Sequence, residues 1–381
     1  MAVLWLGRIS RDTAGRTYLT ELLGPLGRQP GLDIDVHVGD PEFEVPASCR
    51  AVRHRVPYAL GPLGRILAEP IVAAQLTLAR YDVLLAPLNF LPPLWRGPSV
   101  LVQHNVLAFG DSLRVHLSRL RALYRPRALA RSLRRATETI AISRYLRDLL
   151  LAQFPDLDSA HVRVVPYGVS TALVASAQEA PARTGPPTVL VVSALWPYKR
   201  VDQALRAFAM AIDGKDAALL IAGPAPESRR IPLEVLASDL GIRERVRFLG
   251  NVPHRRLGAL YASADVLLYP SDIESFGLPL VEAMMVGVPV IAKRIPGLLE
   301  VGGDGPLWVD ADATDDDVAA ALTQILDDPE LRAERVAAGR ERVGSFTWER
   351  VAQETAQALR DAAAAAAAQD TAARERPADS H

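Results

Sequence analysis

The sequence of 381 residues contains a single cysteine, Cys49, which excludes a fold held by intrachain disulfides and fits a reducing compartment. The chain also lacks any run of eighteen apolar residues, so the sequence offers no membrane-spanning helix. Its first segment, MAVLWLGRIS, has about five apolar residues before Arg8, which are too few for the core of a signal peptide. These absences predict a cytoplasmic protein with at most peripheral contact to the inner face of the membrane.

Lysine is absent from residues 1–170, which carry 21 arginines and 14 acidic residues, a net charge of +7. The rest of the chain carries 22 basic and 30 acidic residues, a net charge of -8. Two halves of opposite sign suggest two domains with different partners.

Histidine and cysteine do not cluster at the spacing of metal ligands. The acidic run DATDDDV, residues 312–318, is interpreted as the start of a helix capped by Thr314 rather than as a metal site. We therefore expect no metal ion and no other cofactor.

Short apolar strands alternate with helical segments along the chain, a pattern typical of parallel α/β sheets. The length allows about two domains. The strands are continuous apolar runs, so we expect helices on both faces of each sheet. The expected strands are 2–7, 32–38, 82–87, 99–104, 139–143 and 162–168, then 188–194, 217–223, 245–250, 265–270 and 288–293. The expected helices include 16–26, 112–136, 200–213, 231–240, 255–263, 278–286 and 316–326.

This alternation predicts two doubly wound, Rossmann-like domains, residues 1–169 and residues 188–346. Residues 170–187 are rich in Ala, Pro, Gly and Ser and are interpreted as the linker between them. A long helix is predicted over 347–368, and the polar tail 369–381 is expected to be disordered.

The segment PSDIESFGLPLVEAM, residues 270–284, places two glutamates on either side of a predicted helix start. Pro279 suits a first helical turn, so the helix begins near Gly277, at the carboxyl edge of the sheet where open α/β domains bind ligands. Free backbone N–H groups there favour a phosphate, and glycine allows its close approach. Glu274 and Glu282 can accept hydrogen bonds from hydroxyls at both ends of a nucleotide-sugar. The alternative is that Glu282 only complements the helix dipole and Glu274 is a solvated acid.

Lys199, in the segment VSALWPYKR (192–200), follows the first strand of the second half and reaches the same edge. An ammonium group there can offset the charge of a departing diphosphate. The alternative is an ordinary surface lysine.

These motifs resemble the retaining glycosyltransferases of family 4, which have the two-domain GT-B fold. Glu274 and Glu282 match the family's Glu-x7-Glu motif, and the match continues in register through most of residues 188–300. Its other segments are YKR, IAGP (221–224), FLGNV (248–252) and LYASADVLLYPS (260–271), with AGRTYLTELL, QHN, IAISRYLRDLL and VVPYGV in the first half.

The resemblance implies a donor site in the second domain. Glu282 then binds the nucleotide ribose, Glu274 contacts hydroxyls of the transferred sugar, and Lys199 neutralises the diphosphate. The backbone N–H groups that contact diphosphate or sugar belong to Phe276, Gly277 and Leu278.

Residues of the first domain are also implied. His104, in VQHN, matches a histidine placed near the reacting carbon, which makes His104, Glu274 and Lys199 the expected catalytic residues. Gly15 and Arg16 match a strand-to-helix loop beside the diphosphate and acceptor. The long C-terminal helix resembles one that crosses back to brace the first domain.

One departure from the family pattern concerns the diphosphate. Many members have Gly-Arg-Leu where this chain has Ser193-Ala194-Leu195, so Ala194 replaces an arginine. Arg200 stands where glycine is common, and we hypothesise that it supplies the missing charge. The alternative is a binding-only relic.

The resemblance implies a metal-independent, retaining transfer by a front-face route, in which the departing phosphate helps to deprotonate the acceptor. The form SALWPYKR favours GDP-mannose as donor, and the acceptor is expected to be a glycan or a lipid-linked acceptor such as a glycolipid. The alternative within enzymes is a sugar-nucleotide epimerase or hydrolase on a similar fold.

Residues 112–137 carry eight arginines and no acid, with leucines at helical spacing until Pro126 interrupts. Such a helix can lie on anionic lipid, and the alternative is a solvated helix face. Nucleic acid is not an expected partner, because interleaved stacking aromatics are lacking. The acceptor pocket is expected to include the loops 53–65 and 87–98.

Overall fold

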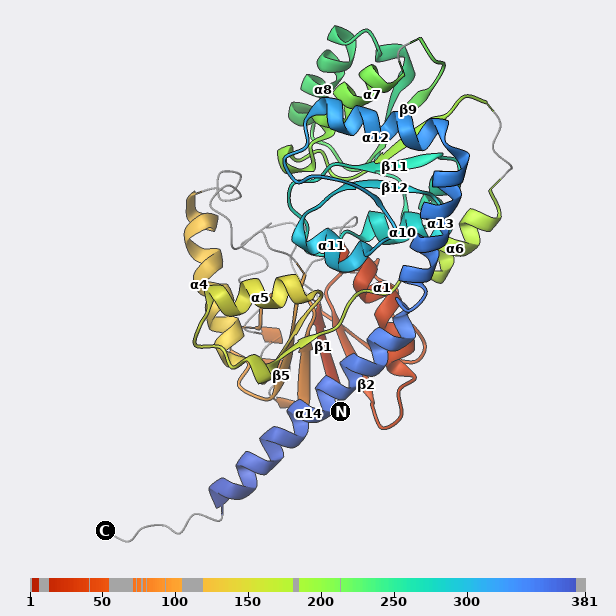
Figure 1. Cartoon of the computed structure of the whole chain (residues 1–381). Coiled ribbons are helices and arrows are strands. Elements are labelled where there is room, and N and C mark those ends of the chain that lie inside the picture. Colours follow the sequence, from red (N-terminus) through yellow and green to blue (C-terminus); the bar gives the residue numbers. More distant parts are fainter. Residues whose placement is uncertain are drawn as a thin grey trace. The chain divides into compact units, whose positions relative to one another are not determined.

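The computed structural model describes residues 2–6, 14–40, 42–54, 71–72, 74–76, 78–79, 81–92, 94–104, 119–180, 185–212 and 214–374. The chain forms two compact units (Figure 1). Unit 1 consists of Met1–Pro166 together with Trp348–His381, and unit 2 is the continuous segment Tyr167–Thr347. The boundary at 166 lies close to the predicted one at 169.

Unit 1 contains a parallel sheet whose described strands lie in the order β3-β2-β1-β4-β5-β6-β7. Every residue of β2, β4, β5 and β6 is buried, as expected for strands covered by helices on both faces. The strands are β1 (Ala2–Leu6), β2 (Ile34–Val38), β3 (Arg50–Arg53), β4 (Val83–Ala86), β5 (Ser99–Gln103), β6 (Glu138–Ala141) and β7 (Val162–Val164). The helices between them include α1 (Ala14–Gly27), α4 (Arg119–Arg135), α5 (Arg144–Gln153) and the short η2 (Ser159–His161).

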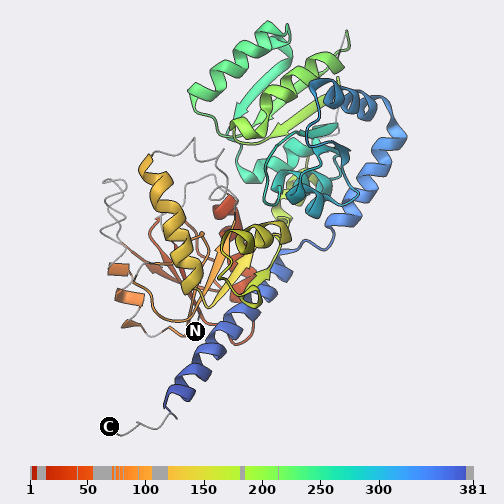
Figure 2. The same ribbon diagram turned by 60° about the vertical axis from the view of Figure 1, so that its left-hand side comes forward.

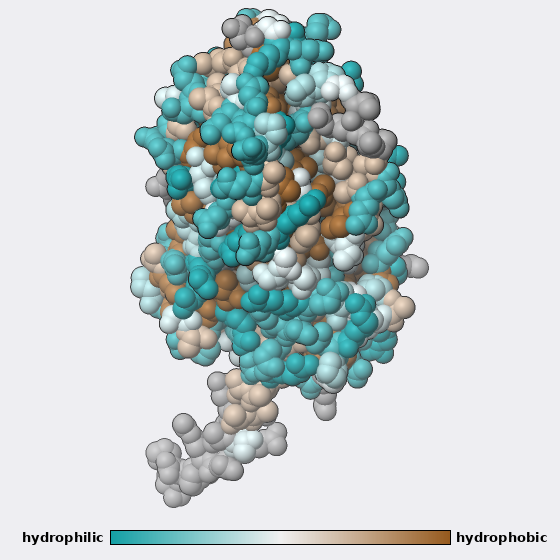
Figure 3. Space-filling view, turned by 45° about the vertical axis from the view of Figure 1, so that its right-hand side comes forward, coloured by the Kyte–Doolittle hydropathy of each residue, from teal (hydrophilic) through white to brown (hydrophobic). Residues whose placement is uncertain are grey.

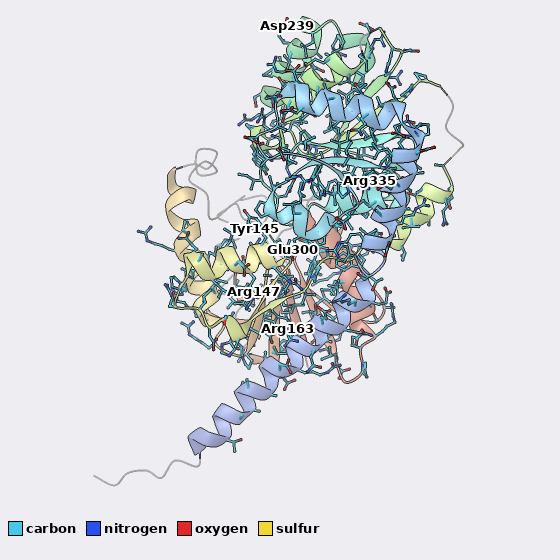
Figure 4. All side chains as sticks on the ribbon, viewed as in Figure 1. Tyr145, Arg147, Arg163, Asp239, Glu300 and Arg335 are labelled. Atoms are coloured by element: carbon cyan, nitrogen blue, oxygen red, sulfur yellow. The ribbon has the colours of Figure 1, made fainter. Side chains whose placement is uncertain are left out.

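The last helix, α14 (Trp348–Arg374), belongs to unit 1 and packs along α1 (Figure 1). Small and apolar side chains of α14, such as Ala352 and Leu359, are fully buried. Arg163, labelled beside α14 in Figure 4, donates a hydrogen bond of 2.6 Å to Asp361. The helix continues to residue 374, so the expected disorder of 369–374 is wrong, and residues 375–381 lie outside the described part.

Unit 2 contains a second parallel sheet, in the order β10-β9-β8-β11-β12-β13. Its core joins strand residues such as Leu219 to helix residues such as Phe208 and Leu322. Figure 2 shows helices on both faces of this sheet. The strands are β8 (Thr188–Val192), β9 (Ala218–Ala222), β10 (Val246–Gly250), β11 (Val266–Tyr269), β12 (Val290–Lys293) and β13 (Leu307–Val309). The helices are α6 (Thr171–Gln178), η3 (Pro197–Lys199), α7 (Val201–Ala211), α8 (Glu227–Asp239), η4 (Arg243–Arg245), α9 (His254–Ala262), α10 (Leu278–Val286), α11 (Pro296–Gly302), α12 (Asp315–Asp327) and α13 (Pro329–Val343).

The two sheets share one topology. In each, the third, second and first strands of the unit lie side by side, and the fourth strand follows on the other side of the first. This is the doubly wound order of Rossmann-like domains, with ligand sites at the carboxyl ends of the strands near the switch point. The predicted fold class is confirmed.

The predicted linker is wrong in its first half, because residues 171–178 form α6. Ser170 caps this helix by accepting a hydrogen bond from the N–H of Leu173, which is fully buried. The helix packs so closely on α9 that a Cβ atom on Gly258 would overlap the carbonyl oxygen of Leu173. Only one fully buried apolar residue anchors α6, so its sequence shows no clear apolar period.

The arginine-rich stretch is described from residue 119 onward, and residues 112–118 lie outside the described part. α4 continues through Pro126 instead of ending there. Proline removes one helical hydrogen bond, but Leu129 and Leu133 are buried beyond it and hold the second half of the helix on the unit.

Among the described helices, none combines the length and the apolar character that crossing a membrane requires. The face shown in Figure 3 is mainly hydrophilic, with hydrophobic residues in groups between hydrophilic ones.

Candidate functional site

Two neighbouring strands of unit 2 carry the predicted site residues at their carboxyl ends. Lys199 lies in η3, after β8, and Glu274 lies in the loop after β11. Because β8 and β11 pair in parallel, both loops emerge at the same edge of the sheet. A backbone hydrogen bond of 2.8 Å from the N–H of Asp272 to the carbonyl of Tyr198 joins the loops.

Lys199 and Glu274 form an ion pair in which Nζ lies 2.5 Å from Oε1. Both side chains are mostly buried, with 14% and 11% of their surface exposed. The hydroxyl of Tyr269 donates a second hydrogen bond to the same oxygen. The other oxygen, Oε2, makes no hydrogen bond or ion pair with any described residue, so one side of the carboxylate is fixed and the other is available to a ligand hydroxyl.

Two tyrosines flank this ion pair. The Nζ atom of Lys199 lies 5.3 Å from the ring centre of Tyr198 and 5.8 Å from that of Tyr269. Burial, together with the Glu274 carboxylate, raises the pKa of Tyr198 to about 12 and holds the pKa of Tyr269 well above its usual range. Both therefore stay protonated at neutral pH, and the Tyr269 hydroxyl stays a donor to Glu274.

The start of α10 has the predicted form. Gly277 occupies the N-cap position in the left-handed region, with φ of 85°, and Pro279 lies in the first turn. No side chain caps the helix, and a Cβ atom at residue 277 would overlap Leu298. Its N-terminal N–H groups and dipole therefore provide a setting that favours an anion.

Phe276 contributes no side chain to this setting, because only 2% of its surface is exposed. Its ring packs edge-on against Tyr167 with centroids 5.0 Å apart, and its centroid lies 5.9 Å from that of Phe346. Tyr167 and Phe346 belong to the two segments near the ends of unit 2, so the anion-binding turn rests on those segments.

Glu282 is the fifth residue of α10, so it lies just beyond the first helical turn in which it was expected. Its Oε2 accepts a hydrogen bond of 2.8 Å from the hydroxyl of buried Tyr261. Its Oε1 lies 3.3 Å from Nε2 of His254, at the start of α9. Two partners thus orient a carboxylate that is only 6% exposed.

Arg200 adopts a left-handed conformation with φ of 51°, which explains why glycine suits this position. Its guanidinium donates to Asp272 at 3.3 Å and lies 3.6 Å from Asp202. Its charge is therefore already shared with two carboxylates. Compensation for Ala194 stays a prediction: Arg200→Ala should weaken donor binding, and unchanged affinity and turnover would refute it.

His104 lies in unit 1, directly after β5, and is buried. Its Nε2–H donates to the carbonyl of Pro87, so in the neutral ring Nδ1 carries no proton. The backbone N–H of His104 donates a hydrogen bond of 2.8 Å to the side-chain oxygen of Asn89, and the His104 ring packs edge-on against Tyr18. Burial lowers the pKa of His104 to about 4, although the bond to Pro87 acts in the opposite direction.

This burial predicts a pH dependence of stability. An unfolded histidine titrates near 6.5, so between pH 6.5 and 4 the unfolded chain binds more protons than the folded one. The free energy of unfolding should therefore fall by about 3 kcal/mol for His104 as the pH drops from 6.5 to 4. Denaturant unfolding at pH 7 and pH 4.5 should show a smaller difference for His104→Gln than for the wild type. The exposed His161→Gln is the control, and equal differences in all three proteins would contradict the prediction.

Gly15 and Arg16 were expected in a strand-to-helix loop, but they lie in the first turn of α1, which begins at Ala14. Arg16 pairs with Asp40 at 3.0 Å, and its guanidinium lies 5.6 Å from the ring centre of Phe43. The expected loop position is wrong because the helix starts earlier than its apolar pattern indicated. Of the two proposed acceptor loops, residues 55–65 lie outside the described part.

The acidic run after β13 is a helix start, as predicted. Thr314 and Asp317 form a capping box, in which each side chain hydrogen-bonds the other's backbone N–H. Within the described ranges, no group of three or more His, Cys, Asp or Glu side chains is arranged to hold a metal ion.

Sequence reasoning missed the side chains that orient the predicted residues. They are Tyr269 beside Glu274, Tyr261 and His254 beside Glu282, and Asp272 beside Arg200, with Lys293 on the other oxygen of Asp272. Asp272 and Tyr269 lie within five residues of Glu274, so the motif's flanks offered a signal for them. The others reach the site from other elements and have no signature in the motif.

Two family models match the chain, one after the other. Residues 16–173 match the model described as Glycosyltransferase Family 4. Residues 175–342 match the model described as Glycosyl transferases group 1. The second match contains the whole set of predicted donor residues from Lys199 to Glu282.

Two curated relatives indicate the range of similar proteins. The chain is 31% identical over 354 residues to a GDP-mannose-dependent alpha-(1-6)-phosphatidylinositol monomannoside mannosyltransferase of Mycolicibacterium smegmatis, with 85% of this chain and 88% of that protein covered. It is 35% identical over 245 residues to a D-inositol 3-phosphate glycosyltransferase of Acidothermus cellulolyticus, covering 61% of this chain. The matched part spans about half of that second relative, 54% of its length.

A solved structure supports the fold. A sucrose-phosphate synthase from Thermosynechococcus elongatus matches with a TM-score of 0.75 at 24% identity, covering 96% of this chain and 99% of that one. The likeness, together with two doubly wound sheets of the same strand order, shows the GT-B fold.

Proposed function

Because the chain belongs to glycosyltransferase family 4, the group 1 glycosyl transferases, we propose that it moves a hexose from a nucleotide-sugar to a glycan or lipid-linked acceptor with retention of configuration. The observation that carries this proposal is the group of side chains and backbone N–H groups at the start of α10. A held carboxylate with one available oxygen, an ammonium group and an uncapped helix N-terminus meet at one sheet edge.

Each part of this arrangement suits one part of the donor. Glu282, fixed by Tyr261 and His254, accepts hydrogen bonds from the ribose hydroxyls. The N–H groups from Phe276 to Leu278 face the diphosphate or sugar, and Oε2 of Glu274 receives a hydroxyl of the hexose.

In the proposed front-face mechanism, the leaving diphosphate gains charge as the bond to the sugar breaks. Lys199 and the start of α10 stabilise that charge, so no metal ion is required. The phosphate takes the acceptor proton, and the protein contributes mainly positioning and electrostatic stabilisation. His104 is proposed to lie near the reacting carbon, with Gly15 and Arg16 near the diphosphate and acceptor.

GDP-mannose is the proposed donor. The segment SALWPYKR favours it, and one relative is described as a GDP-mannose-dependent mannosyltransferase. The other relative is described as a D-inositol 3-phosphate glycosyltransferase, so the acceptor differs among the relatives.

The test is a thermal-shift titration with UDP, GDP, ADP and dTDP and their common sugar conjugates. A ligand at a hundred times its dissociation constant stabilises the fold by about 2.7 kcal/mol, which raises the melting temperature by several degrees. Selective stabilisation by GDP and GDP-mannose is expected. Selective stabilisation by another nucleotide would overturn the donor, and no shift with any nucleotide would favour the binding-only relic or a different ligand.

A sugar-nucleotide epimerase or hydrolase is the alternative within enzymes. Analysis of the products formed without acceptor distinguishes the two functions, since efficient epimerisation or hydrolysis of the donor supports the alternative. A binding-only protein is the alternative outside enzymes, favoured by Ala194 alone.

We also propose peripheral binding to anionic lipid through residues 112–137. In the described part of α4, Arg127 and Arg131 are exposed one turn apart. Arg131 and Arg96 lie close enough to Arg135 to contribute to a lowered pKa of its guanidinium, after burial as the main cause. Such concentrated positive charge gains energy next to an anionic surface.

Vesicle sedimentation tests this surface. Vesicles containing phosphatidylglycerol should bind the protein at low salt, and pure phosphatidylcholine vesicles should not. Arg127→Gln/Arg131→Gln should weaken binding about thirtyfold, at about 1 kcal/mol for each charge. Arg206→Gln/Arg247→Gln removes the same amount of charge from unit 2 and serves as the control. If the wild type does not bind the anionic vesicles, the proposal is wrong.

A further inference from the structure

Lys293 is an unusual residue for the core of an α/β unit. It is the last residue of β12 and only 1% of its surface is exposed. A buried ammonium group needs a compensating partner, because leaving water costs a charge several kcal/mol. The five residues before it, VPVIA, are apolar and give no reason for a charge at this position.

Asp272 is that partner and connects three elements. Its Oδ1 accepts a hydrogen bond of 2.6 Å from Nζ of Lys293, at the end of β12. Its Oδ2 accepts one of 3.3 Å from Arg200, which follows η3. Its backbone N–H donates to Tyr198 at 2.8 Å. The β12 strand end, the η3 segment and the loop after β11 are therefore joined through one aspartate.

This junction adjoins the proposed donor residues on both sides. Lys199 directly precedes Arg200, and Glu274 lies two residues after Asp272, so the Lys199–Glu274 pair closes the same two segments. β11 and β12 lie side by side (Figure 1), with Tyr269 in register with Ala292. Lys293 therefore follows Ala292, the residue paired with Tyr269, and Tyr269 is the second donor to Glu274.

We infer that Lys293 is a positioning residue for donor-sugar binding, acting through Asp272 to fix the loop that carries Glu274. Lys293 donates its hydrogen bond to Asp272, so its effect passes through the aspartate. Arg200, in its left-handed conformation, completes the junction from the other side. The inference rests on the proposed function and deepens it. It states that residues outside the family motif fix the position of the loop that carries Glu274 next to the donor sugar.

The junction should affect the sugar more than the nucleotide. Glu282 is oriented by Tyr261 and His254, which are independent of Asp272, so the ribose contact should survive its loss. Small misplacement of a positioned group lowers a rate by up to about a hundredfold.

The experiment compares Lys293→Met with the wild type by calorimetry with GDP and GDP-mannose. It also compares the rate of GDP release from GDP-mannose, which reports cleavage of the donor whether the sugar passes to an acceptor or to water. We expect the dissociation constant of GDP to stay within about twofold, while the ratio of the GDP-mannose to the GDP constant rises about tenfold and turnover falls ten- to a hundredfold. Lys215→Met is the matched control, because Lys215 pairs with Asp327 on the surface of the same unit. It should behave as the wild type.

Two results would overturn the inference: a folded Lys293→Met protein with unchanged ratio and turnover, or equal loss of GDP and GDP-mannose affinity. If Lys293→Met does not fold, Lys293→Met/Asp272→Asn removes both charges and avoids an unpaired buried charge. The double variant must show the same rise in the ratio of the GDP-mannose to the GDP constant, which a change at Arg200 leaves unaffected because both ligands carry the diphosphate. A wild type that binds neither GDP nor GDP-mannose would instead refute the proposed donor, which keeps the two failures distinct.

Discussion

Replacing Gly223 with alanine is expected to lower the free energy of unfolding by at least about 3 kcal/mol. Gly223 follows β9 with φ of 149°, a conformation that residues with a side chain rarely adopt. A Cβ atom would overlap the carbonyl oxygen of Ser193 and lie 2.5 Å from its carbonyl carbon. The overlapping atoms belong to the backbone of Ser193, so no change of side-chain rotamer can relieve the overlap. The backbone segment before Ala194 must move.

Gly241→Ala is the matched control. Gly241 lies in the same unit with φ of 70°, but an added Cβ atom would meet nothing within 4 Å. Gly241→Ala should lower the free energy of unfolding by about 1 kcal/mol, the cost of the left-handed conformation alone. Guanidinium unfolding of both variants gives the comparison, and a Gly223→Ala variant no less stable than Gly241→Ala would show that the Ser193 segment yields without cost.

Glu274→Gln is expected to lower the rate of sugar transfer by about a hundred- to a thousandfold, or about 3–4 kcal/mol. The amide keeps the size of the side chain but loses the charge that pairs with Lys199 and accepts from Tyr269. Nucleotide affinity should change by less than about threefold, because Glu282 and the start of α10 remain. The measurement is release of nucleotide from the donor, which reports cleavage whether the sugar passes to an acceptor or to water. Binding of the nucleoside diphosphate is measured by calorimetry.

Glu341→Gln provides the control, since Glu341 is exposed on α13 in the same unit. A Glu274→Gln enzyme that retains more than half of the wild-type turnover would remove Glu274 from the proposed chemistry. Dependence of turnover on Glu274 would in turn exclude the binding-only alternative.

The fold was predictable because its strands are apolar runs of ordinary length separated by turn residues. β3 and β13 were missed for a physical reason: β3 is an edge strand with two arginines, and β13 has three residues, so neither shows a buried run. α13 is largely charged and was missed because its few buried residues, among them Gly339, give almost no apolar period.

The candidate site was predictable where backbone chemistry dictates it. Gly277 and Pro279 specify a helix start by themselves, and parallel topology brings Lys199 to the same edge as Glu274. Lys293 and Tyr261 could not be predicted, because their role depends on which side chain faces them across the fold. The residues before Lys293 are ordinary core residues, and those on either side of Tyr261 are half-buried apolar residues.

The placement of α14 in unit 1 has a consequence for how the protein is made. Unit 1 needs both chain ends, whereas unit 2 is one continuous segment of 181 residues, 167–347, and it is complete before α14 leaves the ribosome. At roughly 5–20 residues per second, the surface of α1 and of the sheet that α14 will cover stays uncovered for about ten to forty seconds. Through that interval the nascent first sheet exposes apolar surface of the kind that chaperones bind. The half of the chain that is synthesised first is therefore the half that finishes folding last.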